Sequence, residues 1–154
     1  MSEVFYDTSK LHPYDLNGVL VVENVLYGII DNYPARRKAV PYQAIELYNK
    51  NNRTLRVYVK TADLNVVNTA GSVGLLTVKE SKDSSAPVFT KSTNNPAEGA
   101  IGSPDQGELL FYIVPADTVN LDIRQYVFDV RVTLSSGKVY TVLEGVINLQ
   151  QSLS

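Results

Sequence analysis

The chain of 154 residues contains no cysteine, no tryptophan and a single histidine, His12. The absence of cysteine excludes disulfides, a thiolate nucleophile, cysteine-based zinc sites and iron–sulfur clusters. Pro13 follows His12, and no cluster of histidines or carboxylates lies beside it in the sequence, whereas a catalytic base or a metal ligand needs positioned partners. We therefore expect no metal, no cofactor and no enzymatic activity.

An excess of charge of one sign and long apolar runs are also lacking. The 14 basic residues are balanced by 16 acidic ones, so the lysine and arginine excess typical of nucleic-acid binders is missing. The most apolar window, residues 18–30, contains Glu23 and is shorter than the ~20 residues that a membrane helix needs. The first residues show no basic segment followed by an apolar one, as a secretory signal would. We expect synthesis in the cytoplasm and neither a nucleic-acid nor a membrane partner.

Sequence motifs for catalysis are absent: the chain has no nucleophile elbow, phosphate loop or calcium loop. Carboxylates are scattered over turns and over the polar faces of predicted strands, namely Asp63, Glu80, Asp83, Glu98, Asp105, Glu108, Asp117, Asp122, Asp129 and Glu144. A glycosidase needs two facing carboxyls at a fixed separation, which neighbouring strands could bring together. A small hydrolase on a β scaffold is therefore one alternative.

What the sequence does contain is a period of two. In residues 55–60, Leu55, Val57 and Val59 alternate with polar residues, which predicts a half-buried strand. Residues 126–134 alternate in the same way, and Ser136-Gly137 then predicts a tight turn into a partner strand. Residues 126–149 are thus predicted to form a hairpin, and we interpret Gly145 as the site of a bulge.

Further strands complete an all-β prediction. Residues 109–114 are apolar on both faces, which indicates a central strand that Pro115 ends. Residues 75–80 form another strand, and residues 81–107 read as a long loop with at most a short strand at 88–90. No segment has the period and caps of a long helix. We expect an antiparallel β-sandwich over residues 51–154.

The first third of the chain differs from this pattern. It holds six of the ten tyrosines, and residues 1–16 have no period, so we expect residues 1–50 to form an extended N-terminal arm with short strands. The β-branched runs 18–23 and 25–30 predict strands that belong either to the main sheet or to a neighbouring subunit. Prolines at 34 and 41 indicate a surface loop between them.

This arm supplies the predicted partner contacts. Tyrosine offers a large contact area at low entropic cost, and a basic run could dock on an acidic surface. The alternatives are a floppy tail and an ordinary solvated loop. The predicted contact residues are Tyr6, Tyr14, Tyr33, Arg36, Arg37 and Lys38.

The run Asp122-x-x-x-Tyr126-x-Phe128-x-Val130 resembles the sixth strand of an immunoglobulin-type sandwich with its corner tyrosine. The wider stretch from Thr54 to Leu149 resembles the immunoglobulin-like domain of tailed-phage virion proteins, such as the N-terminal domain of upper baseplate proteins. This resemblance implies an immunoglobulin-like sandwich without catalytic residues.

The resemblance also implies a virion structural or accessory protein that binds other phage virion proteins and copies of itself. In that family a helical or receptor-binding region usually follows the domain, whereas this sequence stops at Ser154. We therefore expect a head decoration protein, a head-fibre base or a tail or baseplate accessory, located in the virion. The remaining alternative is a carbohydrate-binding β-sandwich module, in which exposed tyrosines would stack on sugars.

Overall fold

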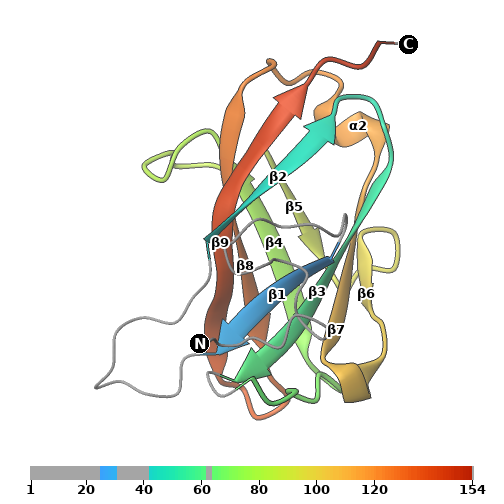
Figure 1. Cartoon of the computed structure of the whole chain (residues 1–154), viewed down its shortest axis with the longest axis vertical. Helices are drawn as coiled ribbons and strands as arrows, with labels where there is room; N and C mark the ends of the chain where they lie inside the picture. Colours follow the sequence, from blue (N-terminus) through green and yellow to red (C-terminus); the bar gives the residue numbers. More distant parts are fainter. Residues whose placement is uncertain (1–24, 31–41, 62–63, 154) are drawn as a thin grey trace, which may run out of the picture.

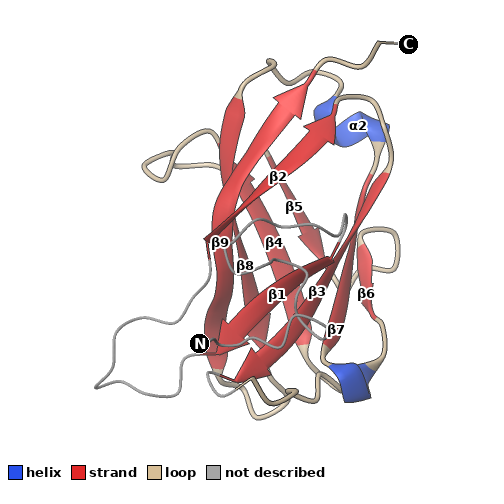
Figure 2. Cartoon of the chain, in the orientation of Figure 1, coloured by secondary structure: helices blue, strands red, loops and turns tan. Residues whose placement is uncertain are grey.

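A computed structural model describes residues 25–30, 42–61 and 64–153. They form two β-sheets packed face to face, as predicted (Figures 1 and 2). One sheet has the strand order β1-β3-β7-β6, with β1 Val25–Ile30, β3 Arg53–Thr61, β7 Glu108–Ile113 and β6 Gly99–Ile101. The other has the order β2-β9-β8-β4-β5, with β2 Tyr42–Tyr48, β9 Val139–Gln150, β8 Gln125–Thr133, β4 Val73–Lys79 and β5 Phe89–Ser92.

Helix is rare in the described chain, as expected. It consists of a single 3-10 turn, η1 (Pro104–Gln106), and one short α-helix, α2 (Pro115–Thr118). Pro115 ends β7 and opens α2, where a missing N–H costs nothing. Over residues 25–30, 42–61 and 64–153, no helix is long and apolar enough to cross a membrane.

The predicted antiparallel pairing holds for β3 to β9, but the two earliest described strands pair parallel. β1 lies parallel to β3, and β2 lies parallel to β9, so both sheets are mixed. Parallel neighbours need a long crossover connection, and the stretch between β1 and β3 provides one by passing through β2 in the other sheet. Run 25–30 thus joins a sheet of its own chain, whereas run 18–23 lies outside the described residues.

Both strands also contribute to the core. Leu26 and Ile30 from β1 and Ile45 and Leu47 from β2 are buried in the same apolar cluster as the rest of the sandwich. Strand β2 was not predicted. Strand β6 was not predicted either, because residues 81–107 read as a loop with at most one short strand. The sandwich core therefore draws on residues from both sides of position 50.

The predicted inward faces are confirmed. Leu55, Val57 and Val59 of β3 are buried, as are the side chains at alternate positions of β8, namely Tyr126, Phe128, Val130 and Val132. Strand β7 is central in its sheet, between β3 and β6, and its outer face is half-buried. The two inner faces interlock to form one core.

The predicted hairpin of β8 and β9 is present, with Gly137 at φ 91° in its turn. The bulge interpretation of Gly145 is wrong: the ladder keeps its register there, and its irregularity lies between Val130 and Arg131. A Cβ atom at position 145 would lie 1.7 Å from the backbone oxygen of Gln43. The glycine instead lets β2 approach β9.

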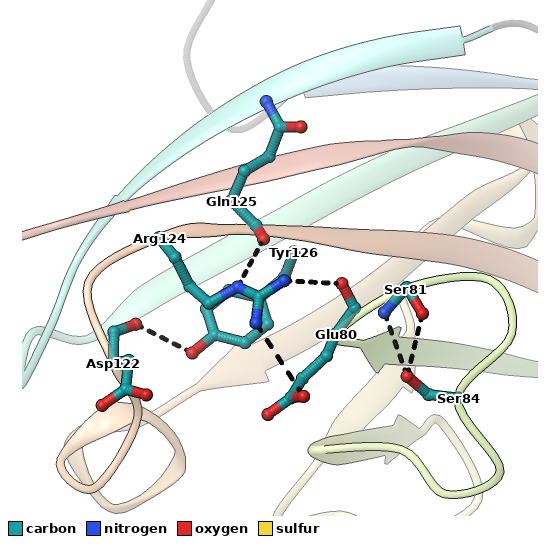
Figure 3. A network of polar contacts seen from close by, with 7 residues as sticks. All are labelled: Glu80, Ser81, Ser84, Asp122, Arg124, Gln125 and Tyr126. Atoms are coloured by element: carbon teal, nitrogen blue, oxygen red, sulfur yellow. Dashed lines mark hydrogen bonds and ion pairs between the residues drawn. The ribbon is translucent and has the colours of Figure 1, made fainter.

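The corner before β8 is closed by the predicted tyrosine. The Tyr126 hydroxyl donates to the backbone oxygen of Asp122 at 2.8 Å (Figure 3). The Arg124 guanidinium stacks 5.3 Å from the centre of the Tyr126 ring and donates to the Glu80 backbone oxygen. These contacts fasten the start of β8 to the end of β4.

Candidate functional site

The contact residues predicted from the sequence cannot be placed. Tyr6, Tyr14, Tyr33, Arg36, Arg37 and Lys38 all lie outside the described residues and stay predictions. Three polar or aromatic features stand out on the surface that the structure describes.

The first feature is strand β2, at the edge of the larger sheet. Its side chains alternate: Ile45 and Leu47 are buried, whereas the outward side chains are exposed. Among the outward residues, Tyr42 is 65% exposed and Tyr48 is 50% exposed. On the side away from β9, no described strand pairs with β2.

Strand β2 is held firmly at its other side. Its ladder with β9 runs from the Tyr42–Glu144 pair to the Tyr48–Gln150 pair. The Gln150 side-chain amide donates to a carboxylate oxygen of Glu46. The Arg53 guanidinium donates to the backbone oxygen of Glu46 at 2.9 Å, so one edge carbonyl already has a partner. The exposed tyrosines therefore project from an ordered strand.

The second feature is Glu108, which is 6% exposed at the start of β7. One carboxylate oxygen accepts from the Ser103 N–H at 2.9 Å, and the other accepts from Arg56 at 2.8 Å and Tyr58 at 3.2 Å. Burial raises the pKa of Glu108, but the Ser103, Arg56 and Tyr58 donors together lower it below its ordinary value. Both carboxylate oxygens of Glu108 already accept hydrogen bonds from the protein, so the arrangement is that of a structural carboxylate.

The third feature is a cleft of about 230 Å³ on the outer face of the larger sheet. Asp129 on β8 lies directly opposite Glu144 on β9, with Lys79 and Lys82 in the same lining. Burial raises the pKa of Asp129, Arg131 lowers it and the facing Glu144 raises it again, for a net increase. Both carboxyls lie on one sheet face, whereas the catalytic pair of a glycosidase flanks the scissile bond.

An ion pair between a buried lysine and a partly buried aspartate joins strand β5 to helix α2. The Lys91 ammonium on β5 lies 2.7 Å from a carboxylate oxygen of Asp117 in α2. The same oxygen accepts from the Val114 N–H, which caps the helix. Sequence reasoning missed this pair because Lys91 occupies an inward strand position that a period of two assigns to apolar residues.

The described residues form no cluster of side chains suited to hold a metal ion. Among the residues that the structure describes, no three histidine or carboxylate side chains come together as a metal site. The signal that could have revealed β2 is weak: Ile45 and Leu47 alternate with Glu46 and Tyr48, but the preceding positions show little contrast.

Comparison with known proteins gives weak structural likenesses, of which two are as follows. No protein-family model matches the chain, and no curated protein matches its sequence. The N-terminal domain of phage TP901-1 ORF48 is similar with a TM-score of 0.48 and 7% identity, over 82% of this chain and 98% of that one. CopC from Methylosinus trichosporium OB3b is similar with a TM-score of 0.35 and 17% identity, over 73% of this chain and 89% of that one. TM-scores at this level do not establish a shared fold.

Proposed function

We propose that the protein is a non-catalytic structural or accessory component of a bacteriophage virion, anchored to other virion proteins. Its role in the particle is that of a head decoration protein, a head-fibre base or a tail or baseplate accessory. The observation that carries the proposal is the stretch from Thr54 to Leu149, whose sequence resembles the immunoglobulin-like domain of tailed-phage virion proteins and which contributes seven strands to a β-sandwich.

Two structural features support the immunoglobulin-like part of the proposal. In that fold, strands B, E and D form one sheet and C, F and G the other. Here β3, β7 and β6 lie in one sheet and β4, β8 and β9 lie in the other. Lettering β3, β4, β6, β7, β8 and β9 in chain order as B, C, D, E, F and G therefore reproduces this division into two sheets. The Tyr126–Asp122 hydrogen bond is of the kind that a corner tyrosine makes. The parallel pairing of β1 with β3 is a departure from the antiparallel sheets of that fold.

The absence of catalysis is also part of the proposal. Glu108 uses both carboxylate oxygens in structural hydrogen bonds. The Asp129–Glu144 pair shares its cleft with two lysines and lies on one side of any molecule that would enter it. Neither arrangement presents an acid and a base on opposite sides of a substrate.

The decisive experiment is quantitative mass spectrometry of purified phage particles. We expect many copies of the protein relative to a single-copy virion component, and retention after a high-salt wash that removes adsorbed host proteins. Absence from washed particles would contradict the proposal. An abundant cytoplasmic protein of the host, followed through the same wash, is the matched control.

A carbohydrate-binding module is the second candidate, because Tyr42 and Tyr48 project from one face of β2. Residues six apart on a strand lie ~20 Å from each other, a span of several sugar rings. A glycan array should then give binders that the double substitution Tyr42→Ala/Tyr48→Ala abolishes. An array without binders excludes this candidate and leaves the virion proposal unaffected.

A further inference from the structure

The four strands at the ends of the two sheets differ in how well they are protected against pairing with another chain. β5 and β6 have only four and three residues, and short edge strands pair poorly. β1 contains a glycine, Gly28, and a glycine in its interior weakens a strand. β2 has seven residues and contains no proline, glycine or lysine. It is the edge most suited to accept a further strand.

The backbone groups of β2 that face outward follow from its parallel ladder. In such a ladder, alternate residues of a strand bond to the neighbour and the others point away. The Asn49 N–H donates to the backbone oxygen of Gln150, so the backbone groups of the odd-numbered positions of β2 face β9. Tyr42, Ala44, Glu46 and Tyr48 therefore direct their backbone groups outward, in agreement with the Arg53 contact to the Glu46 oxygen. A carbonyl oxygen accepts two hydrogen bonds, so Arg53 leaves room for a second donor.

We propose that β2 pairs antiparallel with β2 of a second copy of this chain, about a two-fold axis at Ile45. This register places Tyr42 opposite the partner's Tyr48 and Ala44 opposite the partner's Glu46, twice each by symmetry. Tyrosine pairs across strands are favourable, and no like charges face each other. All seven residues of β2 take part.

Other two-fold registers that also pair the outward backbone groups of β2 with those of the partner's β2 are less favourable. An axis at Glu46 places the two Glu46 carboxylates opposite each other, and like charges directly opposite are destabilising. An axis at Ala44 leaves Tyr48 beyond the end of the partner's β2. Only the axis at Ile45 uses both tyrosines and separates the two glutamates.

The inference deepens the proposed virion role by naming one partner as a second copy, but it is tested on the purified full-length chain. Sedimentation velocity over a concentration series should show a monomer–dimer equilibrium. Ala44→Glu creates two like-charge contacts with Glu46 of the partner subunit and should weaken dimerisation about tenfold. Ala44→Lys creates two attractive contacts and should strengthen it roughly threefold.

The charge swap Ala44→Glu/Glu46→Lys should restore the dimer that Ala44→Glu loses. Val139→Glu and Val139→Lys, at a position on β9 that is exposed to a similar extent as the tyrosines, are matched controls and should leave the equilibrium unchanged. Thermal unfolding of each variant checks that the fold persists.

A chain that stays monomeric at every concentration would overturn the inference, as would equal effects of glutamate and lysine at position 44. Either result would leave the presence of the protein in virions untouched, so the two proposals fail separately.

Discussion

A partly or fully buried carboxylate lies on the outer face of each sheet, Glu108 on the smaller and Asp129 on the larger, and their pKa values shift in opposite directions. Burial disfavours the charged form of both Glu108 and Asp129. Glu108 has three donors and its pKa lies below the ordinary value, whereas Asp129 faces Glu144 and its pKa lies above it. Directed hydrogen bonds, rather than the extent of burial, therefore decide whether a carboxylate stabilises this fold.

The largest expected effect comes from removing the charge of Glu108. Glu108→Gln places an amide group against the donors Ser103, Arg56 and Tyr58, so at least one of them loses its acceptor. We expect the free energy of unfolding to fall by about 2 to 3 kcal/mol in urea denaturation. Glu80→Gln is the control: that carboxylate is exposed and 3.8 Å from Arg124, and its loss should cost less than about 0.5 kcal/mol. Equal losses in the two variants would contradict the special status of Glu108.

The comparison predicts opposite pH profiles of stability. The folded pKa of Glu108 lies below 4.5, so its stabilisation is complete above pH 4.5 and is lost as the pH falls through the folded pKa. The folded pKa of Asp129 lies above 3.8, so the folded state binds the proton more tightly, and stability is lost as the pH rises through that raised value.

Unfolding curves at a series of pH values check both signs. The stability gap between the wild type and Glu108→Gln should narrow below pH 4.5. The wild type should lose stability relative to Asp129→Asn as the pH rises above 3.8. Parallel profiles for the three proteins would refute the contrast.

A smaller effect is expected from one donor of the Glu108 cluster. Tyr58→Phe removes the hydroxyl that lies 3.2 Å from the Glu108 carboxylate, while Arg56 still donates to the same oxygen. We expect a loss of about 1 kcal/mol in the free energy of unfolding. Tyr112→Phe, on the same outer face, should change it by less than half as much, and a reversed order would show that the hydroxyl bond contributes little.

The smallest expected effect has the opposite sign. Asp129→Asn removes the repulsion from Glu144, so at pH 7 the free energy of unfolding should stay constant or rise by up to about 1 kcal/mol. Arg131→Gln, on the exposed side of the same strand, removes an attraction to Asp129 and should shift stability slightly the other way. A clear loss of stability in Asp129→Asn would show that this carboxylate is satisfied after all.

The sequence predicted the parts of the fold in which apolar contrast alone determines the structure. Strong alternation in residues 126–134 and a glycine turn predicted the hairpin. The corner made by Asp122 and Tyr126 was instead predicted from the resemblance to an immunoglobulin-type strand. β2 escaped because its exposed positions hold tyrosine and alanine, so inward and outward residues differ little in hydrophobicity. The role of Gly145 depends on Gln43, a residue 102 positions earlier (145 minus 43), which no local pattern indicates.

The candidate sites were less predictable than the fold. Glu108 and Asp129 looked alike in the sequence, since each is one acidic residue at or near a strand, and their opposite behaviour arises from residues on other strands and loops. Lys91 and Asp117 form their pair although they are 26 positions apart in the chain (117 minus 91), and they thereby place a charge where alternation requires an apolar residue. Interactions of this kind depend on tertiary geometry.

The parallel ladder of β2 with β9 has a consequence for the order of folding. Glu46 and Gln150, which bond across this ladder, are 104 residues apart in the chain. Closing so long a loop costs entropy before any contact forms, so this ladder should assemble after the local β8–β9 hairpin. Substitutions in β2 should then accelerate unfolding while leaving the refolding rate nearly unchanged. One side of β9 therefore stays unpaired in the folding chain until β2 adds to it.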